Sequence, residues 1–168
     1  MADYLKKHYE NPSVAIGYDS RIKSDVFAKV SAGVFAANGV QVNIWPTLMP
    51  VPTVSFATRY LGTSAGVMIT ASHNPSKYNG YKVYGADGCQ ITTEAAAEIL
   101  SEIEKLDIFA DVTTGDFEAG MADGSIRFIA ESSAIRICWR LCLGSRVAGA
   151  DSTALELATM TVFLCSLA

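Results

Sequence analysis

A serine hydroxyl at a sharp polar turn is the first candidate for chemistry in this sequence. The apolar run 66–70 leads directly into a loop that contains Ser72, His73, Asn74 and Pro75. Small neighbours leave room for a bulky ligand to approach the serine, while the histidine and asparagine supply hydrogen-bond donors and the proline limits the freedom of the loop. A serine placed in this way is a candidate nucleophile.

Two other interpretations of Ser72 compete with this one. A serine hydrolase needs a base and an orienting acid, but His8 and His73 are the only histidines and the Gly-x-Ser-x-Gly elbow is absent. His73, next to Ser72 in sequence, would ordinarily point away from it along an extended chain, so the residues disfavour a hydrolase. Judged on its chemistry alone, Ser72 could equally be a loop residue that hydrogen-bonds its own backbone.

Strand and helix patterns alternate around this loop and indicate the fold class. Short apolar runs that end at a glycine or a polar residue are typical of buried strands, and longer periodic segments with capping residues are typical of helices. The alternation predicts an α/β fold, a layered α/β/α domain with a mixed, mostly parallel sheet. Strands are expected at 13–17, 40–45, 65–70 and 81–84, and helices at 3–9, 24–37, 53–61 and 94–106.

The second of these helices carries large apolar residues at helical spacing. They follow the i, i+3, i+4, i+7 pattern of one helix face, which is the pattern of a helix that packs on a core. We therefore expect this face to be buried against the sheet. The residues concerned are Val26, Phe27, Val30, Val34 and Phe35.

Two loops of the predicted sheet leave it at the same edge. One follows the strand that ends near Gly17, and the other follows the strand that ends at Thr70. Ligands of open α/β sheets gather beyond the carboxyl ends of the strands. We therefore expect Arg21 and Ser72 to lie on one rim.

Residues 66–75 resemble, position by position, the active-serine signature of the α-D-phosphohexomutases, the phosphoglucomutase/phosphomannomutase superfamily. Residues 17–21 resemble the Gly-x-Asp-x-Arg loop of that family, and residues 79–82 resemble its Asn-Gly-aromatic-Lys segment. The similarity covers roughly residues 3–127 and implies the N-terminal domain, domain I, without its first strand. The segment 81–91 looks closer to the phosphoglucomutase or phosphopentomutase branch.

The resemblance implies roles for the residues of these loops. Ser72 would carry a phosphoryl group, donate it to a hexose phosphate and take one back from the bisphosphorylated intermediate. Lys82 would assist proton transfer, with a lysine facing water as the simpler alternative. His73 would shape the loop and bond phosphate oxygens. The implied phosphate- and substrate-binding residues are Arg21, Asn74 and Asn79, although an ion pair with Asp19 or Asp25 is the simpler interpretation of Arg21.

The sequence also departs from the family pattern. Family members are several times longer and have four domains, and three of their site loops have no counterpart in these 168 residues. The missing loops are the Asp-Gly-Asp-Gly-Asp-Arg metal loop, the Gly-Glu-x-Ser-Gly sugar loop and the Arg-x-Ser-Gly-Thr phosphate clamp. The resemblance implies Mg²⁺ bound through the phosphate on Ser72, without its protein ligands. We therefore expect negligible mutase turnover from this chain alone.

Residues 132–168 differ from the rest, which we interpret as one domain over residues 1–131. Acidic residues become scarce there, three of the four cysteines appear, and only 134–141 fits a helical stripe. A frameshifted or truncated gene product would give this picture. No Cys-x-x-Cys pair occurs, so reduced thiols are expected rather than a zinc site.

Composition restricts the possible partners. Half of the residues are apolar, 18% are charged, and the net charge is -4 without a basic run, so a nucleic-acid partner is not expected. No apolar segment approaches the ~20 residues of a membrane span, and no secretory signal is visible, so we expect a cytoplasmic protein without a membrane partner. Two hypotheses remain: the serine-bearing domain of a phosphosugar mutase acting on hexose phosphates, or a non-catalytic fragment that binds phosphate or a partner.

Overall fold

A five-stranded sheet organises the computed structural model, which describes residues 1–130. The strands are β1 (Ser13–Tyr18), β2 (Gln41–Ile44), β3 (Ala65–Ile69), β4 (Tyr81–Gly85) and β5 (Ile126–Phe128). Their order in the sheet is β4-β3-β1-β2-β5, and only β4 runs antiparallel to its neighbour. The mixed, mostly parallel sheet that the sequence predicted is therefore confirmed.

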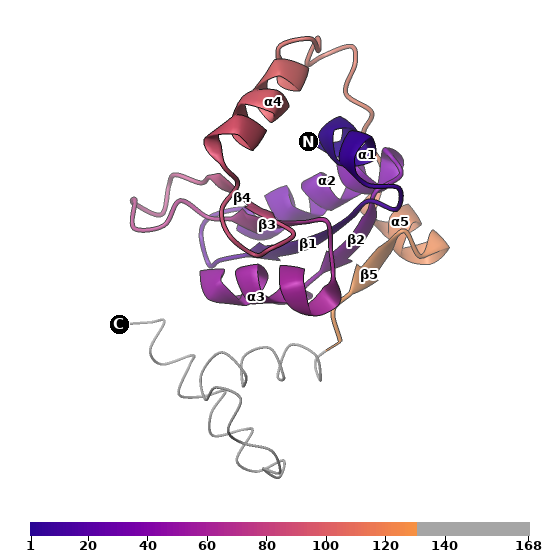
Figure 1. Cartoon of the computed structure of the whole chain (residues 1–168). Helices are drawn as coiled ribbons and strands as arrows, with labels where there is room; N and C mark the ends of the chain where they lie inside the picture. The colour runs from indigo at the N-terminus through magenta and orange to yellow at the C-terminus, as the bar shows by residue number, and fades with distance from the viewer. Residues whose placement is uncertain (131–168) are drawn as a thin grey trace.

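Helices cover both faces of this sheet (Figure 1). Helices α1, α2 and α5 pack on one face, and α3 packs on the other. Helix α4 projects beside α1 and is joined to it by ion pairs from Lys7 to Glu102 and from His8 to Glu98. The helices are α1 (Ala2–His8), α2 (Ser24–Ala37), α3 (Val51–Leu61), α4 (Thr93–Ile103) and α5 (Phe117–Asp123).

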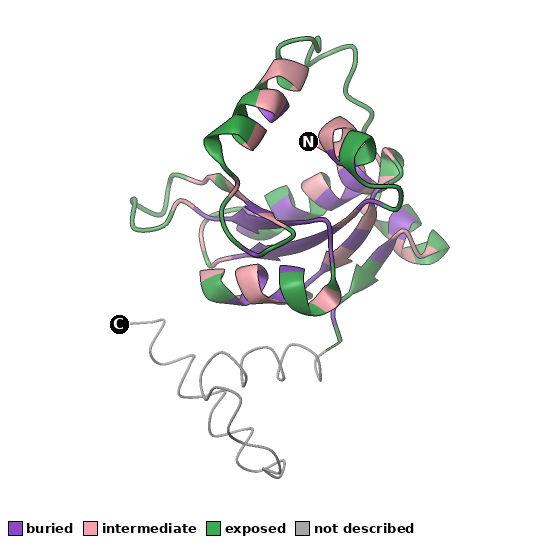
Figure 2. Ribbon diagram, in the orientation of Figure 1, coloured by how far each residue is buried: buried purple, intermediate pink, exposed green. Residues whose placement is uncertain are grey.

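The central strands are the most deeply buried part of the molecule (Figure 2). Every residue of β3 is buried, and β1 is buried from Val14 to Tyr18. Strands covered by helices on both faces need apolar side chains on both faces, which explains their continuous apolar runs. This burial gives the loops that follow β1 and β3 a rigid base.

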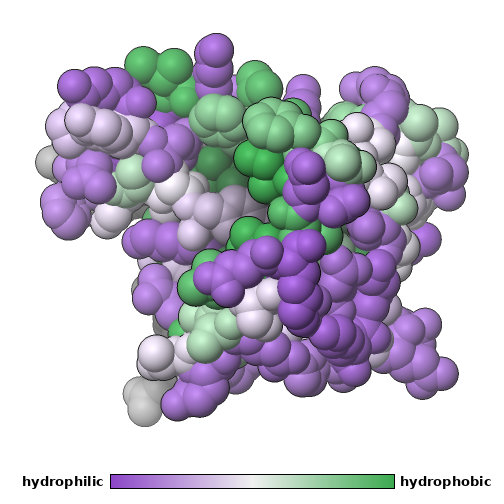
Figure 3. All heavy atoms as spheres, turned by 90° about the horizontal axis from the view of Figure 1, so that it is seen from above, coloured by the Kyte–Doolittle hydropathy of each residue, from purple (hydrophilic) through white to green (hydrophobic). Residues whose placement is uncertain are grey.

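The predicted buried face of α2 was wrong. Val26, Phe27 and Val30 are 47%, 45% and 57% exposed, and Phe35 is the large side chain of the predicted set that is buried. The helix instead packs its small residues Ala28 and Ala32 into the core against the sheet, while Gly33 lies against the backbone of Gly115. Figure 3 looks onto this side of the molecule and shows hydrophobic side chains gathered in a surface hollow.

Helix α5 and strand β5 were not predicted from the sequence. The carboxylate of Asp116 accepts a hydrogen bond from the Ala119 N–H at 2.8 Å and caps α5, while Gly124 ends the helix with a φ of 81°. Strand β5 then pairs in parallel with β2. The other predicted helices and strands are confirmed, with ends that shift by up to three residues.

Residues 131–168 lie outside the described residues, and with them the predicted domain boundary and the helical stripe at 134–141. Among the described helices, none is both long enough and apolar enough to cross a bilayer.

Candidate functional site

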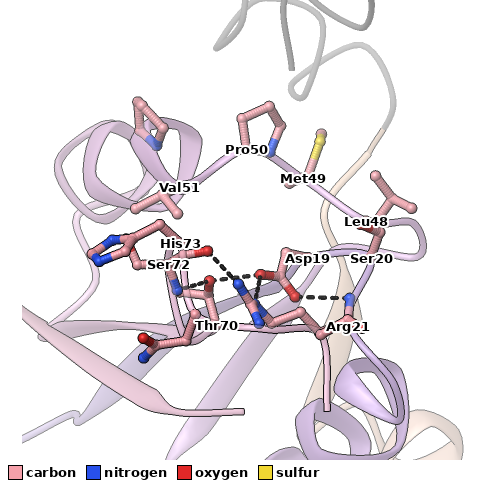
Figure 4. Close-up of a pocket in the computed structure, with 13 residues that line it drawn as sticks. Asp19, Ser20, Arg21, Leu48, Met49, Pro50, Val51, Thr70, Ser72 and His73 are labelled. Carbon is pink, nitrogen blue, oxygen red and sulfur yellow. Dashed lines mark hydrogen bonds and ion pairs between the residues drawn. The ribbon is translucent and has the colours of Figure 1, made fainter. Parts of the chain in front are cut away.

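The loops after β1 and β3 emerge side by side at the carboxyl edge of the sheet. Tyr18 and Ile69 are partners in the parallel register, and the N–H of Asp19 donates to the Ile69 carbonyl at 3.3 Å. The guanidinium of Arg21 then donates to the carbonyl oxygen of Ser72 (Figure 4). The prediction that Arg21 and Ser72 share one rim is therefore confirmed.

Ser72 is exposed and has an uncommon backbone conformation. Its φ is 59°, in the left-handed region that residues with a Cβ rarely occupy. Its N–H donates to the hydroxyl oxygen of Thr70 at 3.0 Å, and Thr70 is 2% exposed. The sharp turn predicted at the end of the strand is thus fixed from below by a buried hydroxyl.

Arg21 holds this loop through its backbone carbonyls. Besides the Ser72 carbonyl, the guanidinium donates to the carbonyls of Pro75 at 3.0 Å and Tyr78 at 3.2 Å, and to the Asp19 carboxylate at 3.2 Å. These bonds use four of its five N–H groups. The role of Arg21 as a phosphate-binding cation stays a prediction. The fifth N–H has no partner among the described residues and is available to donate to a phosphate oxygen.

Asn79 braces the end of the same loop. Its side-chain amide donates to the Ser24 hydroxyl at 2.8 Å and to the Ile22 carbonyl at 3.4 Å, and its side-chain oxygen accepts from the Gly80 N–H at 2.9 Å. These contacts tie the loop to the start of α2. They give Asn79 a structural role and leave its predicted substrate contact untested.

A pocket of about 640 Å³ opens at this rim. One wall is polar and carries the predicted residues Arg21, Ser72, His73 and Asn74, whereas the opposite wall is the apolar segment 48–52 at the start of α3 (Figure 4). Three of the four polar side chains come from the serine loop, so the loop presents a hydroxyl, an imidazole and an amide to one cavity. The remaining lining residues are Asp19, Ser20, Thr70 and Ser76.

Lys82 is outside this set of lining residues. It lies on β4 opposite Met68 in the antiparallel register, and it is half-buried. Because side chains alternate along a strand, Lys82 shares a face with Tyr84, which packs in the core beneath α3. The ammonium group is thus one strand away from the serine loop on the α3 side, and its proton-transfer role stays a prediction.

The tyrosine at the end of β1 is held neutral beside the site. The Tyr18 hydroxyl donates to the Pro46 carbonyl at 3.0 Å. Burial raises the pKa of Tyr18, with a smaller contribution from the negative charge of Asp25. Tyr18 is therefore a hydrogen-bond donor at the end of β1 and carries no charge at neutral pH.

The described residues do not fit a metal site held by protein side chains alone. They contain no cluster of three or more histidines, cysteines and carboxylates. Asp19 lines the pocket, but its two oxygens already accept four hydrogen bonds, from the Arg21 N–H and guanidinium, the Ser24 hydroxyl and the Thr70 hydroxyl. Mg²⁺ stays a prediction.

Sequence reasoning missed two contributors to the site. From the sequence, Thr70 was only the last residue of a strand and Asp19 only a possible ion-pair partner of Arg21. In the structure, both residues anchor the serine loop. The Asp-x-Arg spacing signals such a loop, because a carboxylate two residues before an arginine can accept from its backbone N–H, as Asp19 does at 3.0 Å. Nothing in the sequence marks the wall 48–52.

Comparisons with known proteins agree with this geometry. Residues 1–108 match the model of the phosphoglucomutase/phosphomannomutase alpha/beta/alpha domain I. A phosphoglucomutase of Staphylococcus epidermidis is 48% identical over 106 residues, 63% of this chain and 19% of the relative. A phosphoglucomutase of Staphylococcus saprophyticus is 37% identical over 129 residues, 77% of this chain and 23% of the relative.

A solved structure supports the same family assignment. A Thermus thermophilus protein described as a phosphomannomutase superposes with a TM-score of 0.58 at 36% identity, over 60% of this chain and 23% of that one. The chain spans about a fifth of the length of the relatives it matches. With more than half of its residues matched by the domain model, the chain belongs to the phosphoglucomutase/phosphomannomutase family, as a domain I.

Proposed function

We propose that this chain is the phosphoryl-carrying domain of a phosphosugar mutase of the glucose 1-phosphate/glucose 6-phosphate type, with Ser72 as the phosphorylated residue. The observation that carries the proposal is the exposed Ser72 on the wall of the 640 Å³ pocket, in a loop anchored at both its amide and its carbonyl. Phosphoryl transfer depends mainly on positioning and on stabilising charge. An anchored, solvent-accessible hydroxyl meets the first of these needs.

The proposed reaction is a balanced exchange of one phosphoryl group. The bond between phosphorus and the Ser72 oxygen breaks while a bond forms from the phosphorus to a hydroxyl oxygen of a hexose monophosphate. The proton that the sugar hydroxyl loses passes, overall, to the serine oxygen that the phosphoryl group leaves, and Lys82 is our candidate for assisting this proton transfer. Transfer of the other phosphoryl group of the hexose bisphosphate back to Ser72 restores the phosphoserine.

His73 and Asn74 are proposed to bond the phosphate oxygens. Both side chains line the pocket beside Ser72, and both can donate hydrogen bonds. Donors directed at the oxygens of the transferring group stabilise the charge that develops there. Arg21 is the arginine or lysine side chain among the described lining residues of the pocket, and it is largely committed to the loop.

The incomplete cation set explains why we expect negligible turnover from the chain alone. Loss of a metal ion or a phosphate clamp removes on the order of 10³-fold in rate apiece. In the proposed whole enzyme, the remaining domains would supply these groups and the sugar site. A cytoplasmic location would accompany this function.

The test places the domain in a complete enzyme. A chimera of the Staphylococcus epidermidis phosphoglucomutase, with its matching segment replaced by the 106 similar residues of this chain, should interconvert glucose 1-phosphate and glucose 6-phosphate. Ser72→Ala in the chimera should abolish both turnover and the phosphate found by peptide mass spectrometry. Ser101→Ala, at a serine of α4 that bonds the Glu98 carbonyl and does not line the pocket, is the control and should keep both. Full activity of the Ser72→Ala chimera would refute the proposal.

A non-catalytic binding fragment is the second candidate function. The exposed apolar residues of α2 and α4, among them Phe27, Val30, Leu100 and Ile103, favour it, because surfaces of this kind mark interaction sites. Calorimetry with the chain itself distinguishes the two candidates. Binding of glucose 6-phosphate that Ser72→Ala leaves intact, together with an inactive chimera, would favour the binding fragment.

A further inference from the structure

We infer that Asp19 is a positioning residue of the proposed phosphoryl-transfer site, acting through Thr70 and Arg21 to hold the backbone of Ser72. The inference rests on the proposed role of Ser72 for its functional meaning. The side chains of Thr70 and Arg21 connect Asp19 to both polar backbone groups of the serine (Figure 4). Asp19 itself does not contact the Ser72 side chain through any hydrogen bond of the described residues.

The direction of the hydrogen bonds through Thr70 is fixed by the chemistry of a hydroxyl. Thr70 donates its one hydrogen to the Asp19 carboxylate, an acceptor without a proton of its own, at 2.6 Å. Its oxygen is then free only to accept, and the Ser72 N–H donates to it at 3.0 Å. A side chain without an acceptor at position 19 would leave the Thr70 hydroxyl without this orientation.

The second connection runs through Arg21 to the carbonyl of Ser72. The carboxylate accepts from the Arg21 N–H at 3.0 Å and from its Nε at 3.2 Å, which fixes the plane of the guanidinium. The same guanidinium donates to the Ser72 carbonyl. One carboxylate therefore determines the position of the amide on one side of the serine and the carbonyl on the other.

This double anchor explains why Ser72 can occupy the left-handed region. For a residue with a Cβ, a φ of 59° is unfavourable relative to an ordinary conformation. Such conformations persist where the surrounding contacts over-determine them, and they concentrate at functional sites. Without the anchors, the peptide should relax to negative φ and move the hydroxyl away from its place in the pocket.

Nuclear magnetic resonance of the full 168-residue chain tests the conformational part. A strong intraresidue NOE between the amide and α protons of Ser72 reports positive φ, because the distance between those protons is shortest in that conformation. We expect it in the natural protein and in Thr70→Ser, which keeps the hydroxyl, and we expect its loss in Thr70→Val and Asp19→Ala. Exchange of the Ser72 amide should accelerate roughly tenfold in Thr70→Val, as for one lost hydrogen bond.

A matched control separates positioning from general loss of stability. Thr58→Val removes another buried threonine hydroxyl, which bonds the Val54 carbonyl within α3 and does not touch the loop. It should leave the Ser72 NOE unchanged. An unchanged NOE in folded Thr70→Val would overturn the inference, and Thr70→Val stays informative if Asp19→Ala fails to fold.

The chimeric enzyme gives the functional readout. Thr70→Val should lower kcat by about 10²-fold with KM nearly unchanged, because a small displacement of the reacting oxygen affects the transition state more than substrate binding. Thr70→Ser should restore kcat. An inactive chimera with an intact Ser72 NOE would refute the proposed function but not the anchoring by Asp19. An active chimera whose kcat is unchanged by Thr70→Val would refute the positioning role.

Discussion

The left-handed conformation of Ser72 makes a quantitative prediction about stability. Replacing Ser72 with glycine should give a more stable protein than replacing it with alanine, although neither variant can carry phosphate. Both substitutions remove the hydroxyl, so the comparison isolates the backbone. A φ of 59° is costly for alanine and nearly free for glycine.

The expected difference follows from two opposing terms. Relief of the left-handed conformation favours glycine by about 1–2 kcal/mol. The greater freedom of glycine in the unfolded chain favours alanine by about 0.4–1 kcal/mol. The two ranges together predict that Ser72→Gly exceeds Ser72→Ala in free energy of unfolding by about 0.8 kcal/mol, within limits of about 0 and 1.6 kcal/mol.

Urea denaturation of the two variants measures this difference, and Ser76 supplies the control. Ser76 is exposed in the same loop and has no positive φ, so only the unfolded-chain term applies to it. Ser76→Gly should therefore be less stable than Ser76→Ala by about 0.4–1 kcal/mol. If glycine is the less stable choice at both positions, Ser72 is not strained and the reasoning about its anchors fails.

Three further predictions concern the rest of the domain. A Cβ at Gly33 would lie 2.2 Å from the carbonyl oxygen of Gly115, so Gly33→Ala should lose about 1–2 kcal/mol of unfolding free energy in urea, and equal stability would contradict this packing. Lys7 lowers the pKa of Glu102 to about 2, so the ionised Glu102 carboxylate stabilises the folded protein. This stabilisation is complete above the unfolded pKa of about 4.3 and disappears as the pH falls toward 2. In Glu102→Gln, the free energy of unfolding measured between about pH 4.3 and about pH 2 should fall less steeply than in the natural protein. An unchanged pH dependence in this range would argue against the ion pair. Asp116→Ala should cost about 1 kcal/mol by removing the α5 cap, whereas Asp116→Asn should cost less, as thermal denaturation can show.

The sequence predicted the part of the fold that depends on local patterns. The apolar runs of β1 and β3 are continuous because both faces are covered, and the polar residues that follow them had to emerge at one edge. The expectation that Arg21 and Ser72 lie on one rim was correct for this reason. Strand β5 was missed because three residues are too short for alternation to be visible, and α5 was missed because its seven residues include a glycine and only two large apolar side chains.

Other features depend on contacts that no local pattern reveals. Helix α2 is apolar on more than one side, so the pattern could not show that small residues such as Ala28 face the sheet while Val30 remains exposed. Three acceptors of the Arg21 guanidinium are backbone carbonyls, those of Ser72, Pro75 and Tyr78. Every residue has such a carbonyl, so the sequence does not show which ones Arg21 contacts. The loop anchors therefore became visible only in three dimensions.

The pairing of β5 with β2 has a consequence for how the chain is made. About 80 residues separate the two strands along the chain, and β3, β4 and three helices are synthesised between them. Until residue 128 leaves the ribosome, β2 presents an unpaired edge, which is the kind of surface that recruits strands from neighbouring nascent chains. Chains stalled before this point should therefore need chaperones more than chains stalled shortly after it.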